Sequence, residues 1–282
     1  YYTGHEWDGL RELDTPVPRV FRLWLWLSIA IAILLWVLYP SWPFFNNYAK
    51  GIAGYSSRGN VIAEVTEYQA LRNNQMPEFA VLDVAELAAD PTLEAKYSDA
   101  IGVLYRDNCA ACHGRDLMGQ TNFPNLTDKH WLWSGRPEDI EYTLQVGINH
   151  TSDDTQWAQM PAFGDGMLER SDIKAVVEYV LEISGADHDA NLSATGALIF
   201  EENCASCHND AGIGGYENGA PSLVDDAWIY GGSRNVLTQT LRYGRQGVMP
   251  GWTGRLSDED IKKLTLYVLW ASEDAGENDG SD

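Results

Sequence analysis

Cysteine is scarce in this sequence, and the positions of the few cysteines limit the kinds of site that they can form. The 282 residues include four cysteines, and all four lie in the motifs Cys109-Ala110-Ala111-Cys112-His113 and Cys204-Ala205-Ser206-Cys207-His208. No cysteine remains for a separate disulfide. A zinc knuckle would need further ligands at C-x-x-C or H-x-x-x-H spacing, and a thioredoxin-type pair would begin a βαβ unit. The sequence shows neither context.

Basic residues are also few. The chain has 19 lysines and arginines against 41 aspartates and glutamates, and its formal net charge is -22. A phosphate backbone would repel so acidic a chain, which excludes a nucleic-acid partner. The charge favours a basic partner, although it is equally compatible with a role in solubility alone.

Long apolar runs are absent except for one near the N-terminus. No charged residue occurs from Leu23 to Tyr39, and Val20-Phe21 extends the run past Arg22. A helix over 20–39 is long enough to cross the hydrocarbon core of a bilayer, and Pro40 would end it. The bulky residues that follow do not resemble a signal-peptide cleavage site. The pattern therefore favours a membrane anchor over 20–43, after an N-terminal segment over 1–19, rather than a cleaved signal or a buried core helix.

The two C-x-x-C-H motifs have the spacing at which a c-type haem forms two thioether bonds and takes an axial imidazole. The sequence therefore predicts two covalent haem c groups, on Cys109 and Cys112 with His113, and on Cys204 and Cys207 with His208. Such haems are attached on the outer side of the bacterial inner membrane. This predicts a single-pass inner-membrane protein with a cytoplasmic N-terminus and periplasmic haem domains.

An internal repeat surrounds the motifs. Tyr105 and Phe200 each stand four residues before a first cysteine, and each copy closes with an apolar helix that begins at Ser171 or Ser257. No alternating strand pattern competes with these helical periods. We therefore predict an all-α protein with one transmembrane helix and two tandem class I cytochrome c domains. The expected ranges are 44–91 for a juxtamembrane helix and connector, 92–187 and 188–273 for the two domains, and 274–282 for a frayed acidic tail.

A methionine thioether is the expected second axial ligand of each haem, and the sequence offers only five methionines. Met160 and Met249 each precede a proline and occupy matching places in the two repeats, so each is expected to face the histidine of its own repeat. Met118 and His150 remain alternatives in the first domain.

Further residues are candidates for supporting each haem from the second shell of contacts. Backbone carbonyls of two prolines are placed to orient the imidazoles, two tryptophans to wall the haems or bind propionates, and two arginines to pair with propionates. These residues are Pro124, Pro221, Trp131, Trp228, Arg136 and Arg234.

A haem with both axial positions filled has no open site for substrate, so the chain is expected to transfer electrons and to hold no catalytic site.

Several stretches together resemble the dihaem cytochrome c subunit (CcoP or FixP) of cbb3-type cytochrome c oxidases. They are His5-Glu6-Trp7-Asp8-Gly9-Leu10, Tyr39-Pro40-Ser41-Trp42-Pro43, the two C-x-x-C-H motifs, Gly119-Gln120-x-x-Phe123-Pro124-Asn125-Leu126 and Met160-Pro161-Ala162-Phe163. The resemblance covers nearly the whole chain.

This resemblance implies a subunit of a proton-pumping terminal oxidase. Its haems would take electrons from a soluble, basic cytochrome c and pass them, through a monohaem cytochrome c subunit, to a catalytic haem-copper subunit. A membrane-anchored dihaem cytochrome that serves another respiratory complex or a dehydrogenase is the alternative. A dihaem peroxidase is disfavoured, because Met160 and Met249 leave no open haem position.

Overall fold

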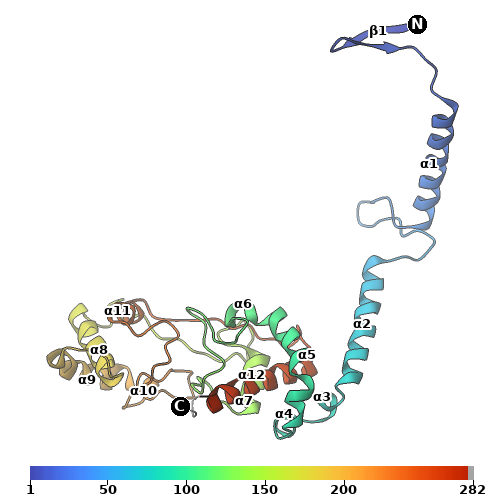
Figure 1. Ribbon diagram of the computed structural model, residues 1–282. Helices are drawn as coiled ribbons and strands as arrows, with labels where there is room; N and C mark the ends of the chain where they lie inside the picture. The colour runs from blue at the N-terminus through green and yellow to red at the C-terminus, as the bar shows by residue number, and fades with distance from the viewer. Residues whose placement is uncertain (279–282) are drawn as a thin grey trace. The chain divides into compact units, whose positions relative to one another are not determined.

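The computed structural model describes residues 1–278, with side chains described to residue 273 (Figure 1). The chain forms two compact units, one over Tyr1–Gln75 and the other from Met76 onward. Each unit has its own internal packing, and the haem-attachment motifs lie in the second.

The first unit opens with a β-hairpin that the all-α prediction does not include. Strands β1 (Tyr2–Trp7) and β2 (Leu10–Leu13) pair antiparallel. Asp8 and Gly9 connect them with φ angles of 47° and 83°, as a two-residue type I′ turn requires. All ten strand residues are exposed, so the strands do not alternate between buried and exposed side chains. The Asp-Gly dipeptide is the sequence signal that could have predicted the hairpin.

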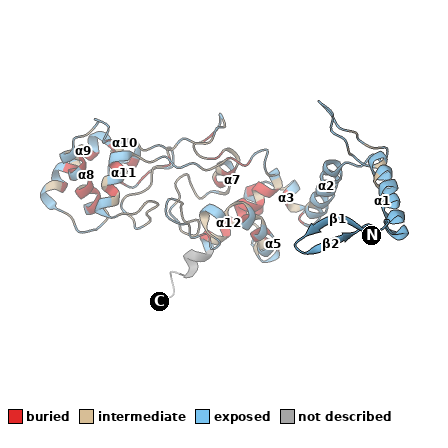
Figure 2. Cartoon of the chain, turned by 90° about the horizontal axis from the view of Figure 1, so that it is seen from above, coloured by how far each residue is buried: buried red, intermediate tan, exposed pale blue. Residues whose placement is uncertain are grey.

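Helix α1 (Arg19–Leu38) coincides with the predicted apolar span and is a candidate membrane helix. None of its residues is buried within the chain, as the pale blue of Figure 2 shows. The helix ends where Tyr39 becomes extended ahead of Pro40, because the residue before a proline avoids helical geometry. Helix α2 (Ser57–Gln75) also has no buried residue.

The second unit is helix-rich, as the sequence predicts. Short helices alternate with long loops, and four longer helices provide most of the buried surface (Figures 1 and 2). The elements are α3 (Glu78–Val81), α4 (Val84–Ala88), α5 (Thr92–Asn108), α6 (Ala110–His113), α7 (Pro137–Val146), α8 (Arg170–Ile183), α9 (Ala190–Asn203), α10 (Ala205–His208), α11 (Arg234–Tyr243) and α12 (Asp258–Asn278).

The two hydrophobic cores of this unit do not follow the two sequence repeats. The first core combines α5 and α7 of the first repeat with α12, the closing helix of the second. The second core combines α9 and α11 of the second repeat with α8, the closing helix of the first. The closing segments of the two repeats are therefore exchanged. Two cores form, but each contains residues of both ranges, 92–187 and 188–273.

Symmetric backbone hydrogen bonds mark the place where the exchanged segments cross. Ile148 and Met249 each donate an N–H to the other's carbonyl, both at 2.9 Å. Met160 and Arg245 do the same, at 2.9 and 3.0 Å. The two methionine loops therefore pair with loops of the opposite repeat, which fixes where each methionine lies.

Two glycines permit this crossing. Gly147 and Gly244 occupy equivalent positions at the ends of α7 and α11, with φ angles of 72° and 70°. A Cβ atom on Gly147 would collide with the backbone of Met249–Gly251, and one on Gly244 with the backbone of Met160–Ala162. Glycine is thus required at both positions, for the left-handed conformation and for the close approach of the crossing segments.

The expected acidic tail is partly helical. Helix α12 continues to Asn278, so the tail begins as an extension of this helix rather than as a frayed end. Residues 279–282 lie outside the described residues.

A glycine in each opening helix lies at the crossing with an exchanged closing helix, and the two differ in what they touch. A Cβ on Gly196 of α9 would overlap the carbonyl of Ala175 and lie 3.0 Å from Cβ of Tyr179, both on α8. On Gly102 of α5 the nearest atom would be the hydroxyl of Tyr267, at 3.1 Å. We expect Gly196→Ala to lower the free energy of unfolding by about 2–3 kcal/mol, because rigid backbone must shift.

Gly102→Ala is the matched control and should change stability by less than about 1 kcal/mol, because the mobile end of Tyr267 can move and alanine favours the helix. Urea unfolding of both variants, followed by circular dichroism, gives the comparison. Equal losses for the two variants would contradict the close packing of α9 on α8.

Candidate haem-binding sites

Each attachment motif forms a single helical turn at the end of an opening helix. In the first repeat the N–H of Cys109 bonds to the carbonyl of Tyr105 at 2.8 Å, and the N–H of His113 bonds to that of Cys109 at 3.0 Å. The second repeat has the same two bonds, at 2.8 and 3.0 Å, around Cys204. The turn brings two thiols and one imidazole together at the rim of each core, and all four thiols are free.

The first cysteine of each motif is a poor nucleophile as a free thiol. Burial raises the pKa of Cys109 to about 12 and that of Cys204 to about 11. A redox-active C-x-x-C pair depends on the opposite shift, towards the thiolate. No group of three or more candidate ligands of the His, Cys, Asp or Glu type is gathered for a metal ion within the described residues. The geometry thus supports neither a thioredoxin-type pair nor a zinc knuckle.

Both histidines are held through one ring nitrogen. Nδ1 of His113 lies 3.2 Å from the carbonyl oxygen of Pro124, and Nδ1 of His208 lies 2.9 Å from that of Pro221. Each ring therefore donates from Nδ1 and keeps Nε2 as the nitrogen able to bind a metal. Burial lowers the pKa of both imidazoles, which favours the neutral form that coordinates iron.

The structure separates the candidate methionines. Met249 packs against the first core together with Cys109, whereas Met160 packs against the second core together with Cys204. Each methionine therefore packs on the core that contains the first cysteine of the other repeat's attachment motif, and not on that of its own. Met118 is 62 % exposed, and Met76 is buried in the first core.

The predicted supporting residues fall into two groups. Trp131 packs against the first core and Trp228 against the second. Unlike the methionines, each tryptophan therefore shares a core with the first cysteine of its own repeat. The arginines bind carboxylates of the chain: Arg136 Nε lies 2.7 Å from Asp139, and Arg234 Nε lies 2.7 Å from Glu178. These ion pairs account for both guanidinium groups without a propionate.

Trp133 is a candidate that the sequence reasoning passed over. Its indole packs against Gly219, in the loop that follows the second attachment motif, and its Nε1 is buried with no hydrogen-bond partner in the described part of the chain. A buried donor without an acceptor is costly, so an acceptor such as a haem propionate fits this position. Nδ1 of His150 is likewise buried and unpaired. These two atoms, with the free Nε2 of each histidine, show that the residues present fit haem groups.

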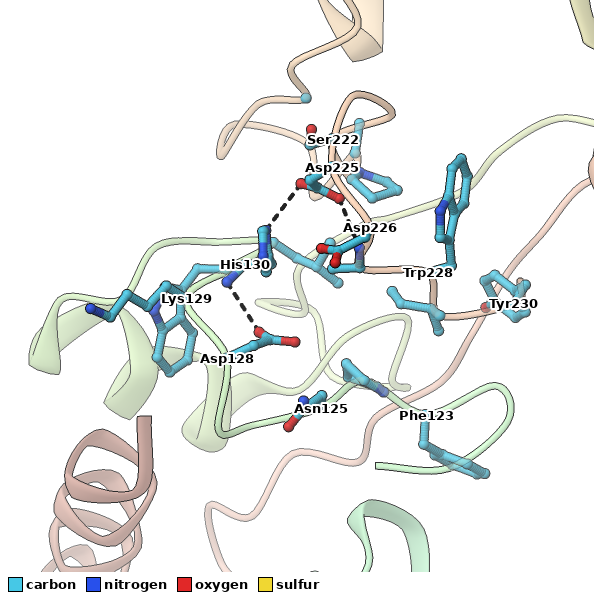
Figure 3. A pocket seen from close by; sticks show the side chains of 18 of the residues that line it. Phe123, Asn125, Asp128, Lys129, His130, Ser222, Asp225, Asp226, Trp228 and Tyr230 are labelled. Atoms are coloured by element: carbon cyan, nitrogen blue, oxygen red, sulfur yellow. Dashed lines mark hydrogen bonds and ion pairs between the residues drawn. The ribbon is translucent and has the colours of Figure 1, made fainter. Parts of the chain in front are cut away.

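A pocket of about 820 Å³ lies between the two repeats (Figure 3). Its walls are the equivalent loops 118–132 and 213–231, which include the prolines that orient the histidines. Nδ1 of His130 bridges the repeats with a 3.0 Å contact to the carboxylate of Asp225, drawn as a dashed line in Figure 3. His130 is exposed and lies at this contact between the two repeats.

Paired attachment turns, histidines held by carbonyls and methionines at each core define a c-type cytochrome. Comparison with known families agrees: residues 100–184 match a cytochrome c model, 191–268 match the model of cytochrome c oxidase, cbb3-type, subunit III, and 1–46 match the N-terminal domain of cytochrome oxidase-cbb3, FixP. The chain belongs to the CcoP/FixP family of cbb3-type cytochrome c oxidase subunits.

The relatives that support this assignment are similar over almost their whole length. The chain is 44 % identical to the cbb3-type cytochrome c oxidase subunit CcoP of Cereibacter sphaeroides over 271 residues, which cover 94 % of this chain and 92 % of the relative. It is 42 % identical to subunit FixP of Bradyrhizobium sp. (strain ORS 278), with the same coverage, and 40 % identical to subunit CcoP of Azospirillum brasilense, with coverage of 94 % and 93 %. Members of this family carry covalent haem c and transfer electrons, and α1 is the candidate membrane anchor of this subunit.

Proposed function

We propose that the chain is the two-haem electron-transfer subunit of a proton-pumping cbb3-type terminal oxidase. It would receive electrons from a soluble cytochrome c and pass them, through a monohaem cytochrome c subunit, to the haem-copper subunit that reduces oxygen. The similarity over 94 % of the chain to cbb3 oxidase subunits carries this proposal. The two equivalent attachment turns support a count of two haems.

The chain's own residues have defined tasks in this function. Cys109 and Cys112 bind one haem covalently, and Cys204 and Cys207 bind the other. His113 with Met249, and His208 with Met160, would bind the two irons, as the packing of the methionines supports. A bound haem iron supplies a one-electron couple, and thioether ligation raises its reduction potential.

The supporting residues keep each site rigid. Pro124 and Pro221 fix the orientation of the imidazoles through their carbonyls. Trp131 and Trp228 pack against the cores on which the haems would lie. Because Met249 and Met160 pack on these cores, the residues that would bind each haem are held in place, which suits electron transfer.

The membrane arrangement forms part of the proposal. Helix α1 would span the bacterial inner membrane once, with residues 1–18 in the cytoplasm and the haem domains in the periplasm. Two features support it: α1 is long and apolar, and Trp24, Trp26 and Trp42 lie in or beside it as interfacial anchors.

The test is oxygen uptake by the complex that co-purifies with this chain in mild detergent, with reduced cytochrome c as donor. We expect cyanide-sensitive uptake and two haem c groups per copy of the chain by the pyridine haemochrome assay. A chain that carries two haem c groups without b-type haem beside it and without uptake would overturn the oxidase assignment in favour of an anchored carrier.

A further inference from the structure

The acidic charge of the chain is unevenly divided between the two haem-attachment regions. Residues 92–136, around the first motif, contain five acidic and five basic side chains. The segment of equal length around the second motif, 189–233, contains no lysine or arginine. It has seven acidic residues: Asp189, Glu201, Glu202, Asp210, Glu217, Asp225 and Asp226.

Most of these carboxylates face solvent without a basic partner. Asp210, Glu217 and Asp226 are exposed, and none of them forms an ion pair within the described residues. The bases near the second core lie on its other elements and not in this segment. Of these, Arg234 pairs with Glu178, and Arg245 stacks on the ring of Tyr230. Lys129 of the first repeat lines the same pocket as Asp226, but none of these bases forms an ion pair with Asp210, Glu217 or Asp226 within the described residues.

Exposed apolar side chains lie within this acidic surface. Ile213 is 60 % exposed and Tyr216 is 59 % exposed, and both line the pocket wall that also includes Asp226. Their loop is tied to the attachment turn, because Gly214 donates its N–H to the carbonyl of His208 at 2.9 Å. In the first repeat, the residue that matches Tyr216 is the polar Thr121.

Exposed apolar side chains beside charges of one sign are typical of a surface that binds another protein transiently. We name five exposed residues the acidic docking surface: Asp210 and Glu217, Ile213 and Tyr216, which lie between these two in the sequence, and Asp226. Electrostatic attraction raises association rates by about 10- to 1,000-fold and weakens with salt. Charge complementarity selects a small soluble electron-transfer protein with a basic face.

We propose that such a basic donor docks on the acidic docking surface, so that electrons enter the chain at the second attachment site, Cys204 to His208, and not at the first. This inference rests on the proposed electron-transfer function and adds the point of entry. The first attachment site, whose surroundings are balanced in charge, then receives its electrons from within the chain.

The test uses the complete complex and a basic monohaem cytochrome c as probe. The variant Asp210→Asn/Glu217→Gln/Asp226→Asn removes three charges from the acidic docking surface. The control Asp99→Asn/Asp107→Asn/Asp116→Asn removes three exposed charges from the first attachment region. Stopped-flow absorbance under anaerobic conditions follows reduction of the chain's haems, so the readout does not depend on oxygen chemistry.

At low ionic strength we expect the first variant to lose about tenfold or more of its second-order rate constant, with a flatter dependence on salt, and the control to lose less than about twofold. Equal losses, or a larger loss in the control, would overturn the point of entry. An unchanged rate together with dissociation of the complex would overturn it as well, because another oxidase subunit would then cover this surface. Oxygen uptake with a small-molecule reductant tests the oxidase function separately, since that activity bypasses the acidic docking surface.

Discussion

Replacing Met249 with alanine is expected to remove thioether ligation from the haem on Cys109 and Cys112, although Met249 belongs to the other repeat. Met249 packs on the first core. Its backbone N–H and carbonyl form hydrogen bonds with the carbonyl and N–H of Ile148 in the first repeat, both at 2.9 Å. The affected haem should lose its methionine-to-iron charge-transfer band. Its reduction potential should fall by roughly 0.1 V or more, because axial ligands set haem potentials over about 0.8 V.

Single-haem chains identify which haem is affected. With Cys204→Ala/Cys207→Ala only the first haem remains, and there Met249→Ala should abolish the band while Met160→Ala preserves it. In the mirror background, Cys109→Ala/Cys112→Ala, the two substitutions should exchange their effects. Ligation within each repeat predicts the opposite result in both backgrounds.

The intact reduced chain provides a second measurement that needs no cysteine replacement. Nuclear Overhauser effects should connect the methyl group of Met249 with Leu126 and Trp131, which share its core. The methyl group of Met160 should instead connect with Leu223 and Trp228. Contacts in the reverse combination would contradict the exchange.

Replacing Arg234 with methionine is expected to lower the free energy of unfolding by about 3 kcal/mol at neutral pH. The side chain of Glu178 is only 3 % exposed and accepts hydrogen bonds from Nε and Nη2 of Arg234, at 2.7 and 3.0 Å. Removing the guanidinium leaves a buried carboxylate with the N–H of Asp189 as its remaining donor, and an unpaired buried charge typically costs about 3–5 kcal/mol. The value is set at the low end because Arg234 is half-exposed.

The pH dependence of this effect has a definite sign. The hydrogen bond with Arg234 lowers the pKa of Glu178, so the folded state holds its proton less tightly than the unfolded state. The pair therefore stabilises the fold above the unfolded pKa, near 4.3, and loses this contribution as pH falls through the lower folded value. The difference between Arg234→Met and the parent, measured by urea unfolding, should narrow from pH 7 towards pH 4.

Arg136→Met is the matched control. Arg136 stands at the start of α7, as Arg234 does at the start of α11, but its pair with Asp139 is a surface contact in which the arginine is 75 % exposed. Such a pair contributes less than about 1 kcal/mol. A loss as large as that of Arg234→Met would mean that burial of Glu178 is not the cause.

The sequence predicts the local features of this protein well. The apolar run ends at Tyr39, ahead of Pro40, and α1 ends one residue earlier, at Leu38. The two prolines after the attachment motifs stand where their carbonyls meet the histidines. These features depend on residues close together in the chain. The length of an uncharged run, a proline that ends a helix and the spacing of a motif can all be read directly from the sequence.

The exchange of closing segments was not predictable from the repeat. Because the two repeats are alike, α5 presents the same kind of surface to α8 as to α12: Gly102 meets Tyr267 as Gly196 meets Tyr179. Contacts within a repeat and between repeats are therefore chemically equivalent. The short connection from Ile183 to Ala190 instead favours α8 and α9 as neighbours, and the closing helix of the second repeat then fills the first core.

The exchange also reverses the order in which the two cores can be completed during synthesis. Everything that the second core needs, from Met160 through α8 and α9 to the end of α11 at Tyr243, leaves the ribosome before α12 does. The first core must wait for Met249 and for α12, which begins at Asp258. The attachment motif that is translated first thus belongs to the core that closes last, and a chain truncated after its first repeat lacks both α12 and Met249, which pack on that core.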